Sequence, residues 1–501
     1  MRRTRLVLTV TALAAASALL LSACTGGEEP APTATGAPDP DATVAIRLVL
    51  EPGNLDILHT AGAALDQILI DNIYQGLVRR LPDQTIEPSL ASEYTVSDDG
   101  LTYTFTLREG ITFHDGKKLT PADVVWSLRT QKKEGTDAAR LSRVKKIQAK
   151  GQTITLTLSE PDSSLLWNLS GRAGLVFKRN DTIDYKTAAN GTGPFTLLAW
   201  KQGDSITFER NDEYWSDKAK AKQIAFHYVP DNQAALNGAL AGDFDVLTGF
   251  DATLKDQVEA NGDFQLVLGS ATDKYVLAMN STREPLSDKN VRKAIRQAIN
   301  HDAQIELAGA GRPLYGPIPE PDPGYEDLSS LVPYDPEAAK QLLADAGAEG
   351  TALTLTVPSF YPTAVSTALV SDLDAVGITL TVDTVDFNTW IDQVYTNKDY
   401  DLSLVDHAEA RDFENWANPD YYFTYDSPEV QSLYQQSLSA VDEAAAADLL
   451  KQAARIVSED MAADWIFNWQ SVQAVATGIT GLPADNVNAR LFLVDVAKST
   501  E

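Results

Sequence analysis

Strand patterns alternate with helical patterns between residues 352 and 405, and this alternation constrains the fold more than any other feature. The strand patterns cover 352–357, 378–385 and 400–405, and the helical patterns cover 363–376 and 387–397. Strands separated by helices in this order become parallel neighbours, because a parallel connection has to cross back over the sheet. Ligands bind such sheets at the carboxyl ends of the strands. The order therefore predicts an α/β fold with a ligand site after one of these strands.

Length and charge narrow the class of protein. The chain has 501 residues, more than one hydrophobic core usually organises, so we expect two or three domains. Its formal net charge is −29, and no run of Lys or Arg is long enough to follow a phosphate backbone. Nucleic acid is therefore excluded as a partner. The acidity indicates a solvated, self-repelling surface.

The N-terminus has the pattern of a secretion signal. Three arginines within the first five residues precede an apolar run at 6–21, which is short for a membrane span and is followed by small residues. The segment 21–24 resembles the bacterial lipobox, in which the cysteine is lipidated. Cys24 is the only cysteine, so it cannot form an internal disulfide. An ordinary signal peptide with an incidental cysteine is the alternative. The segment 25–41 lacks apolar periodicity and is predicted to be a disordered tether.

The stretch 101–125 predicts a strand, a turn and a helix start. Apolar residues alternate with Thr from 101 to 107, and Thr120-Pro121 suits a helix N-terminus. His114-Asp115 between them could be a catalytic dyad, but no nucleophile accompanies it. We therefore interpret it as a turn, since Asp115-Gly116 is a turn sequence.

No other pattern supports catalysis. The sequence has no G-x-S-x-G, H-E-x-x-H or G-x-x-x-x-G-K motif, and its five histidines lack metal-ligand spacing. We therefore predict that the protein is not an enzyme and needs no cofactor or metal. A surface-anchored hydrolase and a structural or adhesive lipoprotein are the alternatives from other classes.

Several segments carry a resemblance to one family. Residues 99–127 read DG-x-TYTF-x-LR-x-G-x-x-FHDG-x-x-LT-x-x-DVV-x-S, residues 192–215 contain TGPF, W-x-x-G-D and ERN-x-x-YW, and residues 291–299 read VR-x-A-x-x-x-A-I. These segments resemble the family 5 extracellular solute-binding proteins, the oligopeptide, dipeptide and nickel receptors of ABC importers. The resemblance implies an α/β, periplasmic-binding-protein-like two-lobe fold (type II, cluster C) with an extra inserted domain.

The resemblance also implies a division of the chain. We expect a signal peptide and a lipidated tether, followed by a discontinuous domain I that is interrupted by domains II and III. The predicted segments are 1–23 (signal peptide), 24–42 (lipidated Cys and tether), 43–75, 191–270 and 476–501 (domain I), 76–190 (domain II, inserted) and 271–475 (domain III).

The loop after the strand 400–405 is the predicted ligand-binding segment. In peptide-binding family members, the equivalent loop supplies an aspartate that pairs with the α-ammonium of the peptide. Here Ala410 falls about where that aspartate is expected, and His407 stands where the family often has Trp. Glu409 or Asp412 could substitute, whereas Arg411 could instead grip a carboxylate. The alternative is a solvated loop whose charges pair with one another.

Further ligand contacts are predicted at predicted strand ends and loops. Large rigid aromatic side chains can enclose an extended ligand in a cleft, although most aromatics in such a chain are core residues. A polar residue at a strand end serves either the ligand or the hinge. These candidates are Trp390, Trp416, Tyr275 and Tyr422 for the aromatics and Asn280 for the polar contact.

The resemblance implies a lipid-anchored receptor on the outer face of the cytoplasmic membrane. We expect a monomer that captures a small peptide or peptide-like solute by hinge closure and delivers it to the ABC transporter permease. The alternative ligand is a nickel or other metal chelate, or another non-peptide solute, with His407 as the metal contact.

Overall fold

The computed structural model describes residues 36–359, 361, 363–485 and 490–500. The predicted signal peptide and the predicted lipidation site, Cys24, lie outside the described residues. Within these residues, no helix is long and apolar enough to cross a bilayer.

One large mixed sheet runs through the whole molecule. Among the described residues it has eleven strands, in the order β15-β14-β16-β12-β17-β11-β1-β10-β9-β8, with β13 also paired to β17. The strands are β1 (Thr43–Leu48), β8 (Phe195–Lys201), β9 (Ser205–Arg210), β10 (Gln223–Tyr228), β11 (Val246–Thr248), β12 (Phe264–Met279), β13 (Arg312–Pro313), β14 (Ala352–Pro358), β15 (Thr379–Val385), β16 (Leu402–His407) and β17 (Ala463–Ala476).

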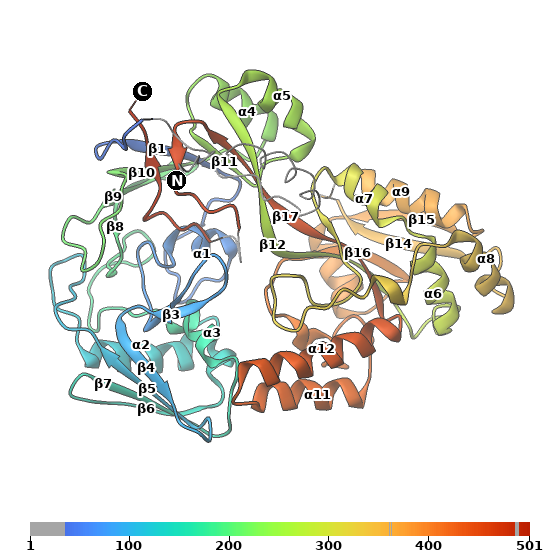
Figure 1. Cartoon of the computed structure of the whole chain (residues 1–501), viewed down its shortest axis with the longest axis horizontal. Helices are drawn as coiled ribbons and strands as arrows, with labels where there is room; N and C mark the ends of the chain where they lie inside the picture. The colour runs from blue at the N-terminus through green and yellow to red at the C-terminus, as the bar shows by residue number, and fades with distance from the viewer. Residues whose placement is uncertain (1–35, 360, 362, 486–489, 501) are drawn as a thin grey trace, which may run out of the picture.

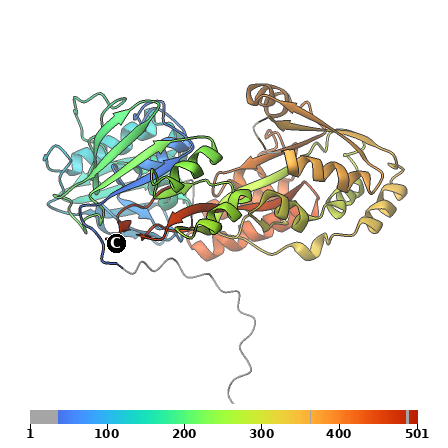
Figure 2. The ribbon, with the colours of Figure 1, turned by 90° about the horizontal axis from the view of Figure 1, so that it is seen from above.

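The molecule has two lobes joined by β12 and β17 (Figure 1). Lobe 1 contains β1 and β8–β11, together with a smaller sheet in the order β4-β5-β7-β6. Lobe 2 contains β14–β16. Seen from above, the two lobes lie side by side along the long axis of the molecule (Figure 2). The remaining strands of lobe 1 are β2 (Val78–Arg80), β3 (Ile86–Pro88), β4 (Ala91–Val96), β5 (Thr102–Leu107), β6 (Val144–Lys150), β7 (Thr153–Leu158), β18 (Ile479–Thr480) and β19 (Ala497–Lys498).

Helices accompany the sheets in both lobes. In lobe 1 they are α1 (Ala63–Leu69), α2 (Pro121–Glu134), α3 (Leu165–Leu169), α4 (Asn232–Leu240) and α5 (Lys255–Asn261), together with the 3₁₀ turn η1 (Ala138–Leu141). In lobe 2 they are α6 (Lys289–Ala298), α7 (His301–Ala308), α8 (Pro336–Asp345), α9 (Thr363–Asp374), α10 (Phe387–Trp390), α11 (Pro428–Ser439) and α12 (Glu443–Glu459).

The sheet of lobe 2 has a hydrophobic core on each of its two faces. Successive side chains of a strand point to opposite faces, and at the end of β12 Leu277 and Met279 join the core formed with α6, α8 and α9. Val276 and Ala278 join the opposite core, which includes Trp465 and residues of α12. The parallel pairing of β14 with β15 and β16 confirms the parallel sheet predicted from the alternation of strands and helices.

The predicted turn at His114-Asp115 is confirmed. The backbone N–H of Gly116 donates to the carbonyl of Phe113 at 2.8 Å, and a side-chain capping box between Thr120 and Asp123 begins α2. His114 is held by the backbone, with its Nε2 atom 3.2 Å from the carbonyl oxygen of Gly193.

Three expectations differ from the structure. The mostly apolar residues 491–496 predict a strand, but they form a loop that places Leu491 and Leu493 in the core of lobe 1. The spacing of apolar residues from 67 to 77 predicts a helix over this range, but the helix ends at Leu69, because the chain turns with a positive φ of 64° at Asp71. The predicted tether is ordered near its end, where Pro38 forms a β-bridge with Ser499.

A buried charge cluster fastens α6 to β17. Both carboxylate oxygens of Asp464 are used: Oδ1 lies 3.2 Å from Nε of Arg296, and Oδ2 lies 3.0 Å from Nε2 of His301. The side chains of Asp464 and Arg296 are each 1% exposed. Arg296 also donates to the carbonyl of Ser458 at 2.8 Å. The positive charge of Arg296 is therefore compensated only while Asp464 is present.

We predict that Asp464→Ala lowers the free energy of unfolding by about 3 to 5 kcal/mol, because it leaves the Arg296 charge buried and uncompensated. Chemical denaturation monitored by circular dichroism measures the change. Glu134→Ala, which removes an exposed ion pair with Lys133, is the control and should leave the free energy of unfolding nearly unchanged. Equal losses for the two variants would contradict this account.

Candidate functional site

The loop that follows β16 is fixed from β12 by a buried lysine. Lys274 donates from Nζ to the carbonyl of Glu409 at 2.9 Å and forms an ion pair with Asp412 at 3.1 Å. Although burial opposes its charge, Asp412 and Asp322 raise the pKa of Lys274. The backbone N–H of Arg411 donates to Asp322 at 2.6 Å, and Arg411 itself has a positive φ of 55°. The loop conformation is therefore set by internal charges.

Two cavities lie beside this loop at the junction of the lobes. The first, which we call the cleft, has a volume of about 390 Å³ and is lined by α1, by residues 167–172 and by Asp273 and Ala408–Ala410. The second, which we call the helical cavity, has a volume of about 640 Å³ and is lined by Pro317, Ile318, Asp322, Pro323, Arg411–Glu414, and by residues of α11, α12 and the segments 136–143 and 162–168. Asp137, Arg140 and Asn168 line both. Each cavity takes its walls from both lobes, as a site that closes around a ligand requires.

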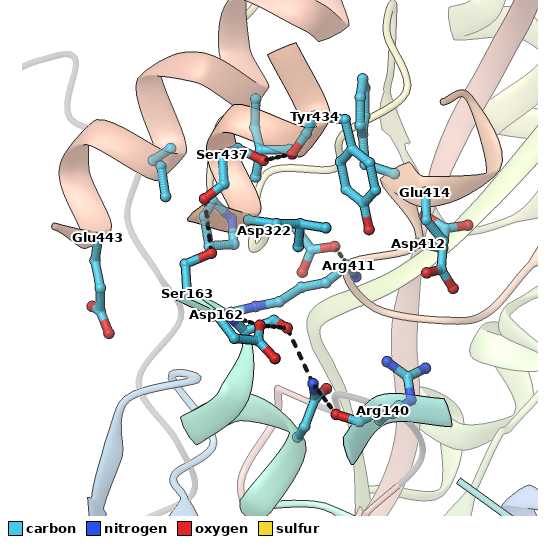
Figure 3. A pocket seen from close by; sticks show the side chains of 18 of the residues that line it. Arg140, Asp162, Ser163, Asp322, Arg411, Asp412, Glu414, Tyr434, Ser437 and Glu443 are labelled. Carbon is cyan, nitrogen blue, oxygen red and sulfur yellow. Dashed lines mark hydrogen bonds between the residues drawn. The ribbon is translucent and has the colours of Figure 1, made fainter. Parts of the chain in front are cut away.

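Figure 3 shows the helical cavity from close by. The side chain of Arg411 crosses the cavity between Asp322 and Asp162. Tyr434 comes from α11 and Glu443 from α12, both in lobe 2. Direct lobe-to-lobe hydrogen bonds close one end: Ser163 donates from Oγ to the carbonyl of Ser437 at 2.9 Å, and its N–H donates to the carbonyl of Leu438 at 2.9 Å.

An arginine–tryptophan–arginine stack stands between the two cavities. The guanidinium carbons of Arg80 and Arg411 each lie 3.7 Å from the ring centroid of Trp167. Two guanidinium groups cannot share one position, so they cover opposite faces of the indole. Cation–π attraction of this kind is worth about 0.5 to 2 kcal/mol per contact. Because Arg80 and Trp167 belong to lobe 1 and Arg411 to lobe 2, the stack links the lobes.

The structure distributes the predicted contact residues unevenly. Glu409 is exposed and lines the cleft, whereas Arg411 and Asp412 line the helical cavity. Asp412 is 9% exposed and already paired with Lys274. A ligand ammonium at Asp412 would therefore compete with an internal cation. The ligand roles of these three residues stay predictions.

The other predicted contacts lie away from both cavities, in the core of lobe 2. Asn280 donates to the carbonyls of Lys398 and Tyr400 at 3.0 Å, and Tyr275 stacks on Phe467 with centroids 4.6 Å apart. The remaining core contacts are Trp390 with Ser403, Trp416 with Phe423 and Tyr422 with Tyr400. These contacts give each side chain a structural role. Apart from the half-buried Tyr275, these side chains have almost no exposed surface with which to contact a ligand, and their ligand roles stay predictions.

His407 is also part of this core. Its Nε2 atom lies 2.8 Å from the hydroxyl oxygen of Tyr422. Burial, together with the nearby Lys274 ammonium, lowers the pKa of His407 to about 4, so the ring is neutral at pH 7. Among the residues that the structure describes, no three His, Cys, Asp or Glu side chains are grouped as metal ligands. The metal-chelate alternative stays a prediction.

Sequence reasoning did not find Arg80 or Trp167. Arg80 stands in a three-residue strand and Trp167 in a five-residue helix, and neither element is long enough to show a periodic pattern. Only the arrangement of the lobes brings these two residues to Arg411, because Arg411 lies 331 positions after Arg80 in the sequence.

The fold and the cavities between its lobes define a two-lobe solute-binding protein. The model of the bacterial extracellular solute-binding proteins, family 5, matches residues 85–428, and the chain belongs to this family. The family resemblance seen in the sequence is thereby confirmed.

Solved structures of similar fold agree. The substrate-binding protein CtaP of Listeria monocytogenes superposes with a TM-score of 0.83 at 18% identity, covering 92% of this chain and 100% of that one. The binding protein AgaA of A. tumefaciens R10, solved in complex with agropinic acid, gives a TM-score of 0.73 at 25% identity, covering 92% and 99%. The predicted two-lobe, periplasmic-binding-protein-like fold is confirmed.

Two curated relatives are similar to this chain over part of their length. Protein XP55 of Streptomyces lividans is 30% identical over 361 residues, which cover 69% of this chain and 65% of the relative. The glutathione-binding protein GsiB of Salmonella typhimurium is 30% identical over 301 residues, which cover 58% of each. The matches therefore span less than two thirds of these relatives.

Asp273 gives the cleft a pH-dependent contribution to stability. Burial, opposed by Lys274 and reinforced by Glu409, raises the pKa of Asp273 to about 6. A carboxyl group whose pKa is raised on folding binds its proton more tightly in the folded state. Its stabilising contribution is therefore full below about pH 4 and is lost as the pH rises through 6.

We predict that Asp273→Asn stabilises the protein at pH 7.5 by about 1 to 3 kcal/mol relative to its effect at pH 4, because the amide is never charged. Urea unfolding at both pH values measures the difference between variant and wild type. Asp256→Asn, at an exposed position, controls for the loss of one charge. A difference for Asp273→Asn that does not change with pH would refute the assignment.

Proposed function

We propose that this protein is the solute receptor of an ABC importer and captures a small peptide or peptide-like solute between its lobes. The observation that carries the proposal is the pair of cavities whose walls come from both lobes. A ligand there would contact both lobes only in the closed form, so binding would shift the population toward closure. Membership of the solute-binding family supports this reading.

The relatives favour a small organic solute. One curated relative is named for glutathione, a tripeptide, and the structure at 25% identity holds agropinic acid. We expect the side chains that line the cleft to decide which solute each member of the family accepts. The cleft of this chain has its own set of lining side chains. We propose that the permease recognises the closed form and that the protein acts as a monomer.

We also propose a lipid anchor at Cys24. The support is the sequence alone: a basic N-terminus, an apolar run and the segment Leu21-Ser22-Ala23-Cys24. Acyl chains at this position would hold the protein at the outer face of the cytoplasmic membrane. Metabolic labelling with a fatty acid tests this point, and the variant Cys24→Ser should lose the label.

Native mass spectrometry of the purified protein tests the receptor proposal directly. We expect a small molecule to co-purify, to be released on denaturation and to raise the thermal unfolding midpoint when added back. Small-angle scattering should show a more compact particle with the ligand bound. Turnover of the added molecule into a product would favour the hydrolase alternative, and the absence of any bound or stabilising solute would contradict the proposal.

Closure itself is testable at a contact outside both cavities. Gln84 of lobe 1 donates from Nε2 to the carbonyl of Pro321 in lobe 2 at 2.7 Å and lines neither cavity. We predict that Gln84→Ala weakens binding of the co-purified solute about 2- to 10-fold, because one net hydrogen bond of the closed form is lost. Calorimetric titration measures the affinity.

A matched variant controls this measurement. On the surface of lobe 1, Gln233 donates a hydrogen bond from Nε2 to Oε1 of Gln257 at 3.2 Å. Gln233→Ala should leave the affinity unchanged. An unchanged affinity for Gln84→Ala would show that the Gln84–Pro321 contact does not contribute to the ligand-bound state.

A further inference from the structure

The cleft contains one cation without a counter-charge. Three of its four arginines have acidic partners: Arg172 pairs with Asp66 at 2.7 Å, Arg140 with Asp137 at 3.6 Å and Arg490 with Asp71 at 3.4 Å. The fourth, Arg80, forms no ion pair and its guanidinium makes no hydrogen bond within the described part of the chain. Glu409 and Asp273 line the same cleft, and neither is among the ion pairs of the described residues.

Arg80 is also deeply buried. It is 2% exposed, and its Nε and Nη1 atoms are enclosed without a hydrogen-bond partner. A buried N–H of a charged group that lacks an acceptor costs more free energy than a buried N–H of a neutral group. The stack on Trp167 holds the plane of the guanidinium and offers no acceptor for its N–H groups. The folded protein therefore holds, at the wall of the cleft, a buried positive charge with N–H groups that lack acceptors.

Neighbouring groups increase the positive character of this wall. Burial, with the guanidiniums of Arg490 and Arg411 nearby, lowers the pKa of Arg80, and the more weakly acting Asp71 and Asp322 oppose this shift. Arg411 on the opposite face of Trp167 has no acidic side chain within ion-pair distance among the described residues, and its Nε is likewise buried without a partner. Two cations thus flank the one indole that separates the cavities.

From these contacts we infer that the cleft selects a solute with a net negative charge and that Arg80 receives its carboxylate. The inference rests on the proposed receptor function and narrows its solute class. A guanidinium presents a planar fork of N–H donors that matches the two oxygens of a carboxylate. The anion supplies the acceptors that Arg80 lacks. Closure of lobe 2 brings Arg411 onto Trp167 and removes water from the ion pair.

This assignment differs from the ammonium-binding role expected for the loop after β16. Ala410 stands about where a peptide receptor has its aspartate, and the nearby Asp412 neutralises Lys274. The loop therefore offers a cationic ligand only Glu409, which is exposed to solvent. Arg80, by contrast, is buried and has N–H groups without an acceptor, which an anion would supply.

A charge series on one skeleton tests the inference. Calorimetry at pH 7.5 and millimolar ligand would compare N-acetyl-trialanine, which is an anion, with trialanine, a zwitterion, and trialanine amide, a cation. Succinate and inorganic phosphate are added to separate a peptide carboxylate from a free organic acid and from a phosphate source. We expect one of the carboxylate anions to bind at least about 10-fold more tightly than trialanine amide.

Substitutions at Arg80 supply a second readout with an opposite sign. Arg80→Met should reduce affinity for the bound anion about 10- to 100-fold and raise the thermal unfolding midpoint of the ligand-free protein, because it removes an unpartnered buried charge. Arg80→Lys, which keeps the charge and loses the fork, should bind with intermediate affinity. The control is Arg108→Met, at an arginine that lies over Trp215 outside both cavities and should leave anion binding unchanged.

The outcomes separate the two proposals. If trialanine or its amide binds at least as well as the anions, or if Arg80→Met leaves anion affinity unchanged, the inference is overturned while the receptor function stands. If phosphate binds and the carboxylates do not, the carboxylate assignment is overturned. If no probe of any charge binds and no solute co-purifies, both proposals fail. A lower midpoint for ligand-free Arg80→Met would make Arg80 a structural residue and would also overturn the inference.

Discussion

The antiparallel pairing of β12 with β17 is the constraint on which the rest of the structure depends. These strands carry one sheet from lobe 1 into lobe 2, so the lobes cannot separate and have to move about this pair (Figure 1). The register shifts between Ser270 and Lys274, leaving the intervening residues outside the regular ladder. Such an irregularity bends a strand and re-aims its side chains. Here it delivers Asp273 to the cleft and Lys274 to the loop after β16, so the connection between the lobes and the site share the same residues.

The charges at the junction follow from this geometry. Lys274 neutralises Asp412 and holds the carbonyl of Glu409, which removes much of the negative potential that the sequence of the loop suggests. Lobe 1 contributes arginines to the opposite wall, and all but Arg80 are matched by acids. Arg80 is therefore the one arginine of the cleft lining that has no acidic partner among the described residues, while Glu409 and Asp273 are acids of the same lining without an ion-pair partner there.

The sequence predicted the fold well because the relevant signals are local. Alternating apolar residues in 102–107 and 153–158 define strands β5 and β7, and Asp335-Pro336 marks the start of α8, where Asp335 accepts from the N–H of Ala338. The predicted strand at 491–496 failed for a physical reason. Its apolar residues serve the core of lobe 1 from a loop, and a short apolar run alone does not distinguish a buried strand from such a loop.

The candidate site could be predicted only in part. The loop at 408–412 was found because it follows a parallel strand, and each of its five residues lines one of the two cavities. The aromatic candidates are large and lie near strand ends, yet packing in lobe 2 uses Trp390, Trp416 and Tyr422 as core. Arg80 became visible as a site residue only from what it lacks, an acceptor, and a sequence does not record the partners of a side chain.

The overall charge and the cleft charge act over different distances. A protein of net charge −29 repels an approaching anion, but salt screens exposed charges beyond about 8 Å at physiological ionic strength. Inside the cleft, the surrounding protein replaces water and the interaction with Arg80 is screened far less. The acidic surface therefore gives an anionic solute no steering advantage, and any preference for it has to arise at contact. A receptor built in this way would select its solute after entry, through the fit between the carboxylate of the solute and the guanidinium of Arg80. Closure of the lobes over Trp167 would strengthen this ion pair by removing water from it.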